Sequence, residues 1–482
     1  MPNFILELLL KTTPQQMKTL NKRLEAARHL YNCCVNEALN RCQLIKESLL
    51  WQRARKTKNK KLYKEAIEKY KFSEYSLHSF VKEHQKKFSK HIDSSTGQKI
   101  ATRAFLATKE YLYKKRGRPR YKGKNQFRSV EGKSNVAGLK FVDGKFVWKD
   151  LILEIIYDKI DKDGIEAHGL SCKTKYVRFV KRFIKGKERF YIQLIQNGKP
   201  KIKARHQSNN ASLGLDIGPS SIAYVSENSA ELKPFVQELN FKTAQKKKLQ
   251  KKLCRKRRLN TKLSNRAKKI KNAIAEIDRV EASTRKKLHG ELSNIILKIG
   301  CFINTEKLSY RSFQKNFGRS VKKRAPGKFL EILSRKAENA GGRVFEFSPH
   351  AFKLSQLCHN CGSIKKKKLS DRHHVCDCGI GAQRDLYSAF LALFVNEKGF
   401  DKSRAHLAWP SVESLLERAL SKCSETMSGE HKLESFGLNQ RQNCSPVKDR
   451  SVHTEVSDVV PKLNLDLERA EKRYAAQLLR TP

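Results

Sequence analysis

Three acidic residues lie where a carboxylate is unusual for the local pattern. Asp216 interrupts the apolar run 213–218, and Glu306 ends the apolar run 301–305. Asp385 begins an apolar run with helical spacing. An unpaired carboxylate is costly to bury, so each of these side chains needs a partner, and a metal cation is one candidate.

Taken singly, each acid also has an ordinary explanation. Asp216 and Glu306 could be polar residues at strand ends, and Asp385 could be a helix N-cap, because Asp is a preferred capping residue. Their order favours a site, since a strand Asp, a strand-end Glu and a helix Asp are the acids that a ribonuclease-H-like fold brings together. Three adjacent carboxylates repel one another unless cations neutralise them. Mg²⁺ prefers carboxylate oxygen.

We therefore predict that these acids are catalytic and hold two Mg²⁺ ions, with Mn²⁺ as the alternative metal. Two ions about 3.5–4 Å apart can activate a water molecule and stabilise the leaving oxygen of a phosphodiester. The predicted chemistry is metal-dependent hydrolysis of a phosphodiester by a nuclease.

Four of the twelve cysteines are clustered in two short motifs, each followed by glycine. Four thiolates suit one closed, structural Zn²⁺ site, and the predicted ligands are Cys358, Cys361, Cys376 and Cys378. The second pair has a single intervening residue, so either its geometry adapts or His373 or His374 replaces a cysteine. Four free thiols are the alternative.

Basic residues are concentrated in a loop broken by Gly and Pro and in a helical stretch. The helical spacing would spread its charges around the helix, and a nucleic-acid backbone is a natural neutralising partner. A localisation signal would look similar. The predicted nucleic-acid contacts are Arg116, Arg118, Arg120, Lys122, Lys124, Arg128, Lys251, Lys252, Arg255, Arg257 and Arg258.

The whole chain shares this positive charge. Its 482 residues carry a formal net charge of +55 with a pI near 10.0. Such a charge points to a polyanionic partner. We expect no membrane association, because no apolar run approaches the ~20 residues of a spanning helix and the N-terminus lacks signal-peptide features. The cysteine spacing does not suit secreted disulfides, so we expect a cytoplasmic, nucleoid-associated protein.

The elements that must position these side chains fall into two halves. The first half should contain a strand at 4–10, charged helices over 15–115 and short antiparallel strands between 138 and 195. The second half should run β-β-β-α-β-α-β. Its expected elements are strands at 213–217, 222–226, 236–241, 301–305 and 343–347, and helices within 242–299 and at 326–340 and 386–395. The turn after Asp216 should place that residue near an edge of the sheet.

The chain resembles the TnpB family, which is close to the compact type V CRISPR effectors. The resemblance is carried, in order, by Asp216-Ile217-Gly218, Glu306-Lys307-Leu308, the two cysteine motifs and Arg384-Asp385. It implies an RNA-guided DNA endonuclease that binds a guide RNA, recognises a short motif beside the target and unwinds double-stranded DNA by guide pairing. Matching the family motifs residue by residue assigns the three acids and the four cysteines to the same roles.

The resemblance also implies a domain plan. The expected fold class is α+β and multidomain, with an N-terminal helical bundle plus a small β-barrel and a C-terminal ribonuclease-H-like (RuvC) domain carrying an inserted zinc element. The expected domains are a wedge-like barrel (1–14 and 116–200), a helical recognition domain (15–115), a linker (201–211), the RuvC-like nuclease (212–350 and 381–398), the zinc-binding insert (351–380) and a polar, partly disordered C-terminal tail (399–482).

One departure and several alternatives remain. Where the family often has Asn-Ala-Ala after the last acid, this chain has Tyr387-Ser388-Ala389. The alternatives are an RNA-guided repressor without cleavage, a transposase, whose last acid should be Glu, and a non-enzymatic nucleic-acid-binding zinc protein. The origin of the guide, the target-adjacent motif, cleavage of single strands in trans and the oligomeric state stay open.

Overall fold

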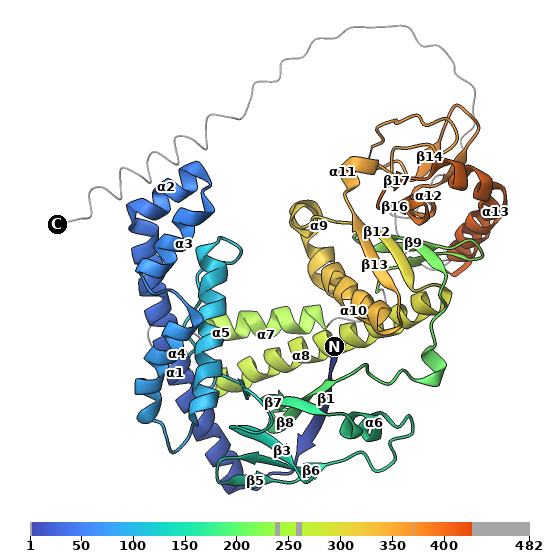
Figure 1. The fold of residues 1–482 in the computed structure, drawn as a ribbon. Coiled ribbons are helices and arrows are strands. Elements are labelled where there is room, and N and C mark those ends of the chain that lie inside the picture. Colours follow the sequence, from blue (N-terminus) through green and yellow to red (C-terminus); the bar gives the residue numbers. More distant parts are fainter. Residues whose placement is uncertain (1, 237–241, 257–262, 369, 427–482) are drawn as a thin grey trace. The chain divides into compact units, whose positions relative to one another are not determined.

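The computed structural model describes residues 2–236, 242–256, 263–368 and 370–426 (Figure 1). Its N-terminal region combines helices with antiparallel strands. The helices are α1 (Pro14–Glu47), α2 (Leu49–Thr57), α3 (Lys60–Lys69), α4 (Glu74–Lys86), α5 (Ser94–Leu112) and the short α6 (Ile165–Ser171). A capping box at Thr13 starts α1, and the Asp93 side chain caps α5.

The N-terminal strands form two antiparallel sheets. The larger has the order β2-β7-β8-β1-β6 and the smaller β3-β4-β5. Their bounds are β1 (Asn3–Leu10), β2 (Ser129–Glu131), β3 (Leu139–Val142), β4 (Lys145–Trp148), β5 (Leu151–Leu153), β6 (Ile155–Ile156), β7 (Thr174–Ile184) and β8 (Lys187–Asn197). One hydrophobic core joins these sheets to α1, α4 and α5. A short 3-10 turn, η1 (Ala204–His206), follows.

The C-terminal region is built on a mixed five-stranded sheet of order β11-β10-β9-β12-β13. Strands β9, β12 and β13 are parallel, whereas β10 is antiparallel to both β9 and β11. The bounds are β9 (Ser212–Ile217), β10 (Ser221–Val225), β11 (Ala230–Pro234), β12 (Phe302–Glu306) and β13 (Arg343–Phe347).

Helices α8 and α10 pack on one face of this sheet and α12 on the other, whereas α7 packs against α8. The helices of the region are α7 (Thr243–Arg255), α8 (Asn265–Ile299), α9 (Tyr310–Arg324), α10 (Pro326–Asn339), α11 (Pro349–Phe352), α12 (Arg384–Leu393) and α13 (Lys402–Thr426). Two short hairpins complete the region: β14 (His373–Val375) with β15 (Gly381–Gln383), and β16 (Val395–Asn396) with β17 (Gly399–Phe400).

Alternation along the central strand separates two packing surfaces. Leu213 and Leu215 share a core with residues of α8 and α10, including Ile296 and Leu333. The opposite surface carries Gly214, and there α12 packs across β9, β10 and β12.

The approach of α12 depends on Gly214. A Cβ at this position would lie 1.9 Å from the carbonyl oxygen of Ala389 and 2.6 Å from the amide nitrogen of Leu393. Beside Gly214 on the next strand, the Asn304 amide donates to the carbonyl oxygens of Leu393 at 3.3 Å and Val395 at 2.8 Å. These contacts fix the C-terminal end of α12 on the sheet. Because a helix is rigid, they also limit where its N-terminal end can lie.

The sequence analysis placed one strand at the wrong residues, and it placed Asp216 at the wrong position in the sheet. The third strand is β11, not the expected 236–241; Val236 has a left-handed φ of 56°, and 237–241 lie outside the described residues. Only Leu232 of β11 is buried, so its apolar signal was weak. Asp216 is not near an edge of the sheet, because β9 is the central strand.

The sequence analysis did not predict a helix in the expected polar tail (399–482), and the structure forms α13 at 402–426. Apolar residues recur there every three or four positions and are buried, which is helical periodicity that the charged neighbours masked. They are Ala405, Trp409, Val412, Leu416, Ala419 and Cys423. Helix α13 packs against β11, and the rest of the expected tail lies outside the described residues.

We expect Gly214→Ala to destabilise the protein by about 1–3 kcal/mol or more, because the added methyl group must push α12 away from β9. Urea unfolding followed by circular dichroism measures the change. Gly117→Ala is the matched control, since a Cβ at Gly117 meets nothing within 4 Å. Equal stability of the two variants would contradict the close approach of α12.

Candidate functional site

Two of the predicted acids lie side by side because of the register of parallel strands. Leu215 of β9 pairs with Thr305 of β12, and the next residue on each strand is an acid. Asp216 and Glu306 therefore point to the same surface of the sheet, opposite Leu215 and Thr305 and on the side that α12 covers. Both side chains are half-buried at the carboxyl ends of their strands.

The third acid comes from the N-terminal end of α12. Gln383 is the N-cap of this helix, and its side chain accepts a hydrogen bond from the Leu386 amide at 2.8 Å. Asp385 is therefore not the cap. Its buried carboxylate accepts a hydrogen bond from Ser221 Oγ of β10 at 2.9 Å and lies 3.7 Å from Arg384 Nε.

All three acids line one cavity of about 970 Å³. Burial raises the pKa of Asp216 well above its ordinary value, and the negative charges of Asp385 and Glu306 raise it further, whereas Arg384 lowers it. Burial also raises the pKa of Glu306. These shifts mean that the carboxylates are costly to ionise together, and a cation with oxygen preference would relieve the cost.

Cations surround the same cavity. Its lining includes the side chains of Arg324, Lys367, Arg372 and Arg384. Arg384 is held in place by donating to the carbonyl oxygen of Asp371 at 2.8 Å. A cavity lined by both acids and cations suits a substrate that is itself an anion, such as a phosphodiester.

Some residues of this cavity were missed in the sequence. Ser221 follows the turn after β9, and the alternation of β10 places it on the same surface as Asp216. Arg324 ends α9, a helix that the sequence did not predict because Val321 is its only buried residue. Arg372 has no distinctive local pattern.

The four predicted cysteines do come together. All four sulfur atoms lie within 4.8 Å of one another; Cys358 and Cys378 are 3.6 Å apart, and Cys361 and Cys376 are 3.5 Å apart. Four sulfurs around a tetrahedral zinc, each about 2.3 Å from the metal, are separated by about 3.8 Å. The cluster therefore has the chemistry and dimensions of a zinc site.

Neither His373 nor His374 belongs to this cluster, whose ligand atoms in the described residues come from the four cysteines. The ring of His374 stacks on Tyr387 with centroids 4.2 Å apart, and its Nδ1 contacts Lys367 Nζ.

The pKa of Cys376 is lowered to about 6, first by the backbone amide of Cys378 and then by Ser363, so this thiol readily becomes the thiolate that metal binding needs.

Tyr387 connects the cysteine cluster to the helix of the third acid. Its hydroxyl accepts from the His359 backbone amide at 3.0 Å and lies 2.8 Å from His359 Nδ1. His359 follows Cys358 directly, and Tyr387 is fully buried two residues after Asp385. The departure from the family pattern thus provides an anchor between the two motifs.

The predicted basic contacts are mostly exposed. Arg116, Arg118, Arg120, Lys124 and Arg128 are exposed in or after the basic loop, while Lys122 is half-buried. The loop is fixed to α1, because the Lys122 amide donates to Asn32 Oδ1 at 2.8 Å and Tyr121 Oη donates to Asn36 Oδ1 at 2.7 Å.

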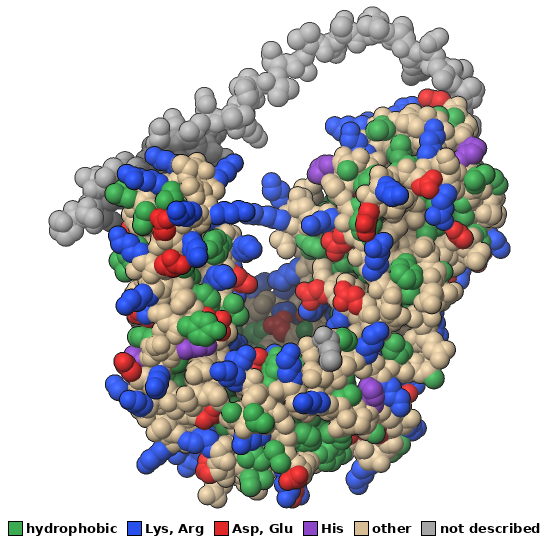
Figure 2. All heavy atoms as spheres, in the orientation of Figure 1, with side chains coloured by type: hydrophobic (Ala, Val, Ile, Leu, Met, Phe, Trp, Pro, Cys, Tyr) green, Lys and Arg blue, Asp and Glu red, His purple; other side chains and the backbone are tan. Residues whose placement is uncertain are grey.

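The other basic contacts belong to the helical stretch. Lys251, Lys252 and Arg255 are exposed on α7, whereas Arg257 and Arg258 lie outside the described residues. Lysine and arginine side chains are spread widely over the face in Figure 2.

No helix in the described ranges is long and apolar enough to cross a membrane.

Comparison with known proteins supports the resemblance. Residues 327–391 match the family model "Cas12f1-like, TNB domain". A search of curated proteins found no match. Among solved structures, "Cryo-EM structure of the Cas12f1-sgRNA-target DNA complex" aligns over 83% of this chain and 99% of that chain, with 13% identity and a TM-score of 0.44.

A second solved structure, "Cryo-EM structure of CRISPR-Cas12f Ternary Complex", aligns over 80% of this chain and 82% of that chain, with 16% identity and a TM-score of 0.31. Overlaps of this size do not by themselves establish a common fold. The family-model match, however, includes the four cysteines and Asp385. The resemblance predicted from the motifs is thereby confirmed: this is a protein similar to TnpB and the compact type V effectors.

Proposed function

We propose that this protein is an RNA-guided DNA endonuclease that hydrolyses phosphodiester bonds at Asp216, Glu306 and Asp385. The observation that carries the proposal is the convergence of these acids, from two strands and one helix, on a single cavity that cations surround. That arrangement, on a mixed sheet with α12 on one surface, also favours a ribonuclease-H-like (RuvC) domain. Mg²⁺ is the preferred cofactor and Mn²⁺ the alternative.

Each residue has a distinct part in the proposed reaction. The three carboxylates, which line one cavity, would hold two ions. When bound, the ions would activate a water molecule and stabilise the leaving oxygen. Ser221 orients the Asp385 carboxylate through its hydrogen bond. Arg384 and Lys367, which line the same cavity, would neutralise phosphates of the bound strand.

The guide and target follow from the family and the charge. The family-model match is to a Cas12f1-like domain, and the solved structures named above contain sgRNA and target DNA or are ternary complexes. A formal charge of +55 suits binding of both a guide RNA and double-stranded DNA. We place this activity in the cytoplasm, on the nucleoid.

We further propose that the four cysteines hold one structural zinc ion. The zinc would fix the segment of Cys358 and His359, and the Tyr387 hydroxyl would transmit that order to α12 and Asp385. The zinc element would thus stabilise the catalytic helix without taking part in the chemistry.

Asp216→Asn is expected to lower Mg²⁺-dependent cleavage by about a thousandfold or more, because metal stabilisation of the transition state is worth several kcal/mol. Cleavage of a guide-matched plasmid by protein that carries its RNA measures the effect. Glu331→Gln, an exposed acid on α10, is the control and should cut normally. Retained cutting by Asp216→Asn would refute the triad. Loss of target binding with loss of cutting would indicate a binding site instead.

Metal analysis should find about one equivalent of zinc per chain. Cys358→Ser should release it and lower the melting temperature, since a structural zinc site contributes directly to folding. Cys254→Ser, which removes an exposed thiol from α7, should retain the zinc. Wild-type protein without zinc, or a Cys358→Ser variant that keeps it, would exclude this site.

A further inference from the structure

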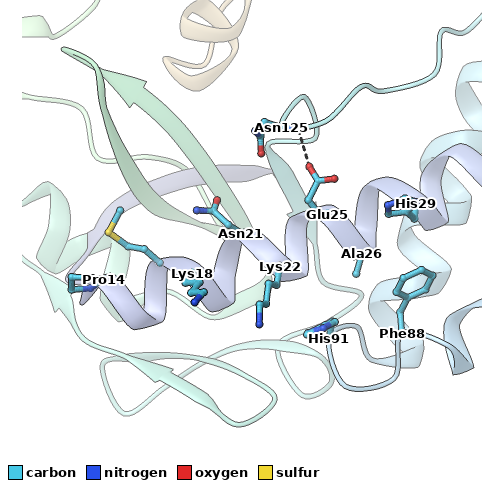
Figure 3. A pocket seen from close by; sticks show the side chains of 11 residues that line it. Pro14, Lys18, Asn21, Lys22, Glu25, Ala26, His29, Phe88, His91 and Asn125 are labelled. Carbon is cyan, nitrogen blue, oxygen red and sulfur yellow. Dashed lines mark hydrogen bonds between the residues drawn. The ribbon is translucent and has the colours of Figure 1, made fainter. Parts of the chain in front are cut away.

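A groove of about 780 Å³ lies along the first half of α1, far in sequence from the three acids (Figure 3). Residues of α1 form one side of it. Phe88 and His91, from the segment between α4 and α5, form another, and Asn125 of the basic loop contributes as well. None of the motifs identified in the sequence accounts for this groove.

The groove has an apolar, partly aromatic lining. Met17 and Ala26 of α1 contribute aliphatic atoms, and Phe88 is half-buried. The imidazole of His29 lies nearly parallel to the Phe88 ring, with centroids 6.0 Å apart and an interplanar angle of 14°. A wall of flat rings on a highly charged protein suits a ligand that is planar and apolar on its faces.

The charges beside this lining are uncompensated cations. Lys18 and Lys22 are exposed, one helical turn apart, and neither forms an ion pair with any residue in the described ranges. The one acid in the lining, Glu25, is already satisfied: its carboxylate accepts from the Asn125 amide at 2.7 Å and from Arg28 Nε at 2.7 Å. Figure 3 shows the Glu25 side chain directed toward Asn125.

His91 reports the positive field of this groove. Burial lowers the pKa of His91, the cations of Arg23, Lys22 and Lys149 lower it further, and Asp150 raises it. The imidazole is therefore neutral at neutral pH and can both donate and accept a hydrogen bond. An anionic ligand would meet unneutralised charge here.

We propose that this groove binds an unpaired nucleotide of a nucleic-acid strand, with the base against Phe88 and successive phosphates at Lys18 and Lys22. The inference rests on the proposed nucleic-acid-directed function and adds a defined subsite to it. Lysines four residues apart on a helix have Cβ atoms about 5–6 Å apart, so the two can contact neighbouring phosphates. A base inside a duplex hides its faces, whereas an unpaired base exposes them for stacking.

The first test is the salt dependence of binding. Full-length protein, freed of copurified RNA, is titrated with a short fluorescent oligouridylate at several salt concentrations. Each phosphate contact to a single strand contributes about 0.7 to the slope of log K against log salt, so Lys18→Gln with Lys22→Gln should reduce it by about 1.4. Lys18→Arg with Lys22→Arg keeps both charges and should keep the slope.

The second test separates stacking from charge. Phe88→Leu keeps an apolar side chain but removes the ring, so it should weaken oligouridylate binding about tenfold while leaving the salt slope unchanged. Thermal melting checks that this variant remains folded. If Phe88→Leu unfolds, Phe88→Met, which also removes the ring and keeps an apolar side chain, takes its place with the same expected loss. Phe88→Tyr keeps the ring and should bind as the wild type does.

Three results would overturn the proposal: an unchanged slope in the double glutamine variant, unchanged affinity in a folded Phe88→Leu variant, or the same loss of slope with duplex but not single-stranded probes. Parallel titrations with oligodeoxythymidylate assign the strand to RNA or DNA. Oligonucleotide binding requires no metal. If the double glutamine variant keeps the wild-type slope while the wild-type protein performs guided cleavage, the groove alone is rejected. If the variant's slope falls but the wild-type protein does not perform guided cleavage, the endonuclease alone is rejected.

Discussion

The rest of this structure depends on one constraint, which is that three carboxylates are held close together at the edge of a buried core. Asp216 and Glu306 come from neighbouring parallel strands, and Asp385 comes from the helix that covers them. Burial and mutual repulsion raise the pKa of Asp216, so the arrangement is unfavourable without a compensating cation. Under the proposed function, bound Mg²⁺ would offset this cost.

Contacts along α12 hold the three acids together despite the unfavourable burial and repulsion of their charges. Gly214 lets the backbone of α12 lie against β9, and Asn304 holds the end of that helix through two carbonyl oxygens. At the other end, Ser221 holds Asp385, and Tyr387 fixes the helix to the segment of the cysteine cluster. Helix α12 is thus fixed at both ends and along its length, which limits how far the third carboxylate can move from the other two.

The acids could be identified in the sequence because each interrupts, ends or begins an apolar run. The cysteines could be identified because they occur in two closely spaced pairs. The sequence also predicted most strands and helices of the C-terminal region, where apolar alternation is strong. It failed at β11, which buries only Leu232, and at α13, whose apolar stripe is diluted by charge. Contacts such as those of Ser221 and Tyr387 depend on which elements meet in space, and no local pattern records that. The roles of the basic residues remain predictions.

Thermal melting without divalent metal tests the central claim most directly. Because the folded-state pKa values of Asp216 and Glu306 are raised, the metal-free protein should lose stability as pH rises from about 4 toward neutral. Asp216→Asn should then melt higher than wild type in EDTA at neutral pH, by about 2–4 °C for each kcal/mol of repulsion relieved, and gain less from Mg²⁺. An Asp216→Asn variant that melts at or below the wild-type temperature in EDTA, with the same gain from Mg²⁺, would contradict the account.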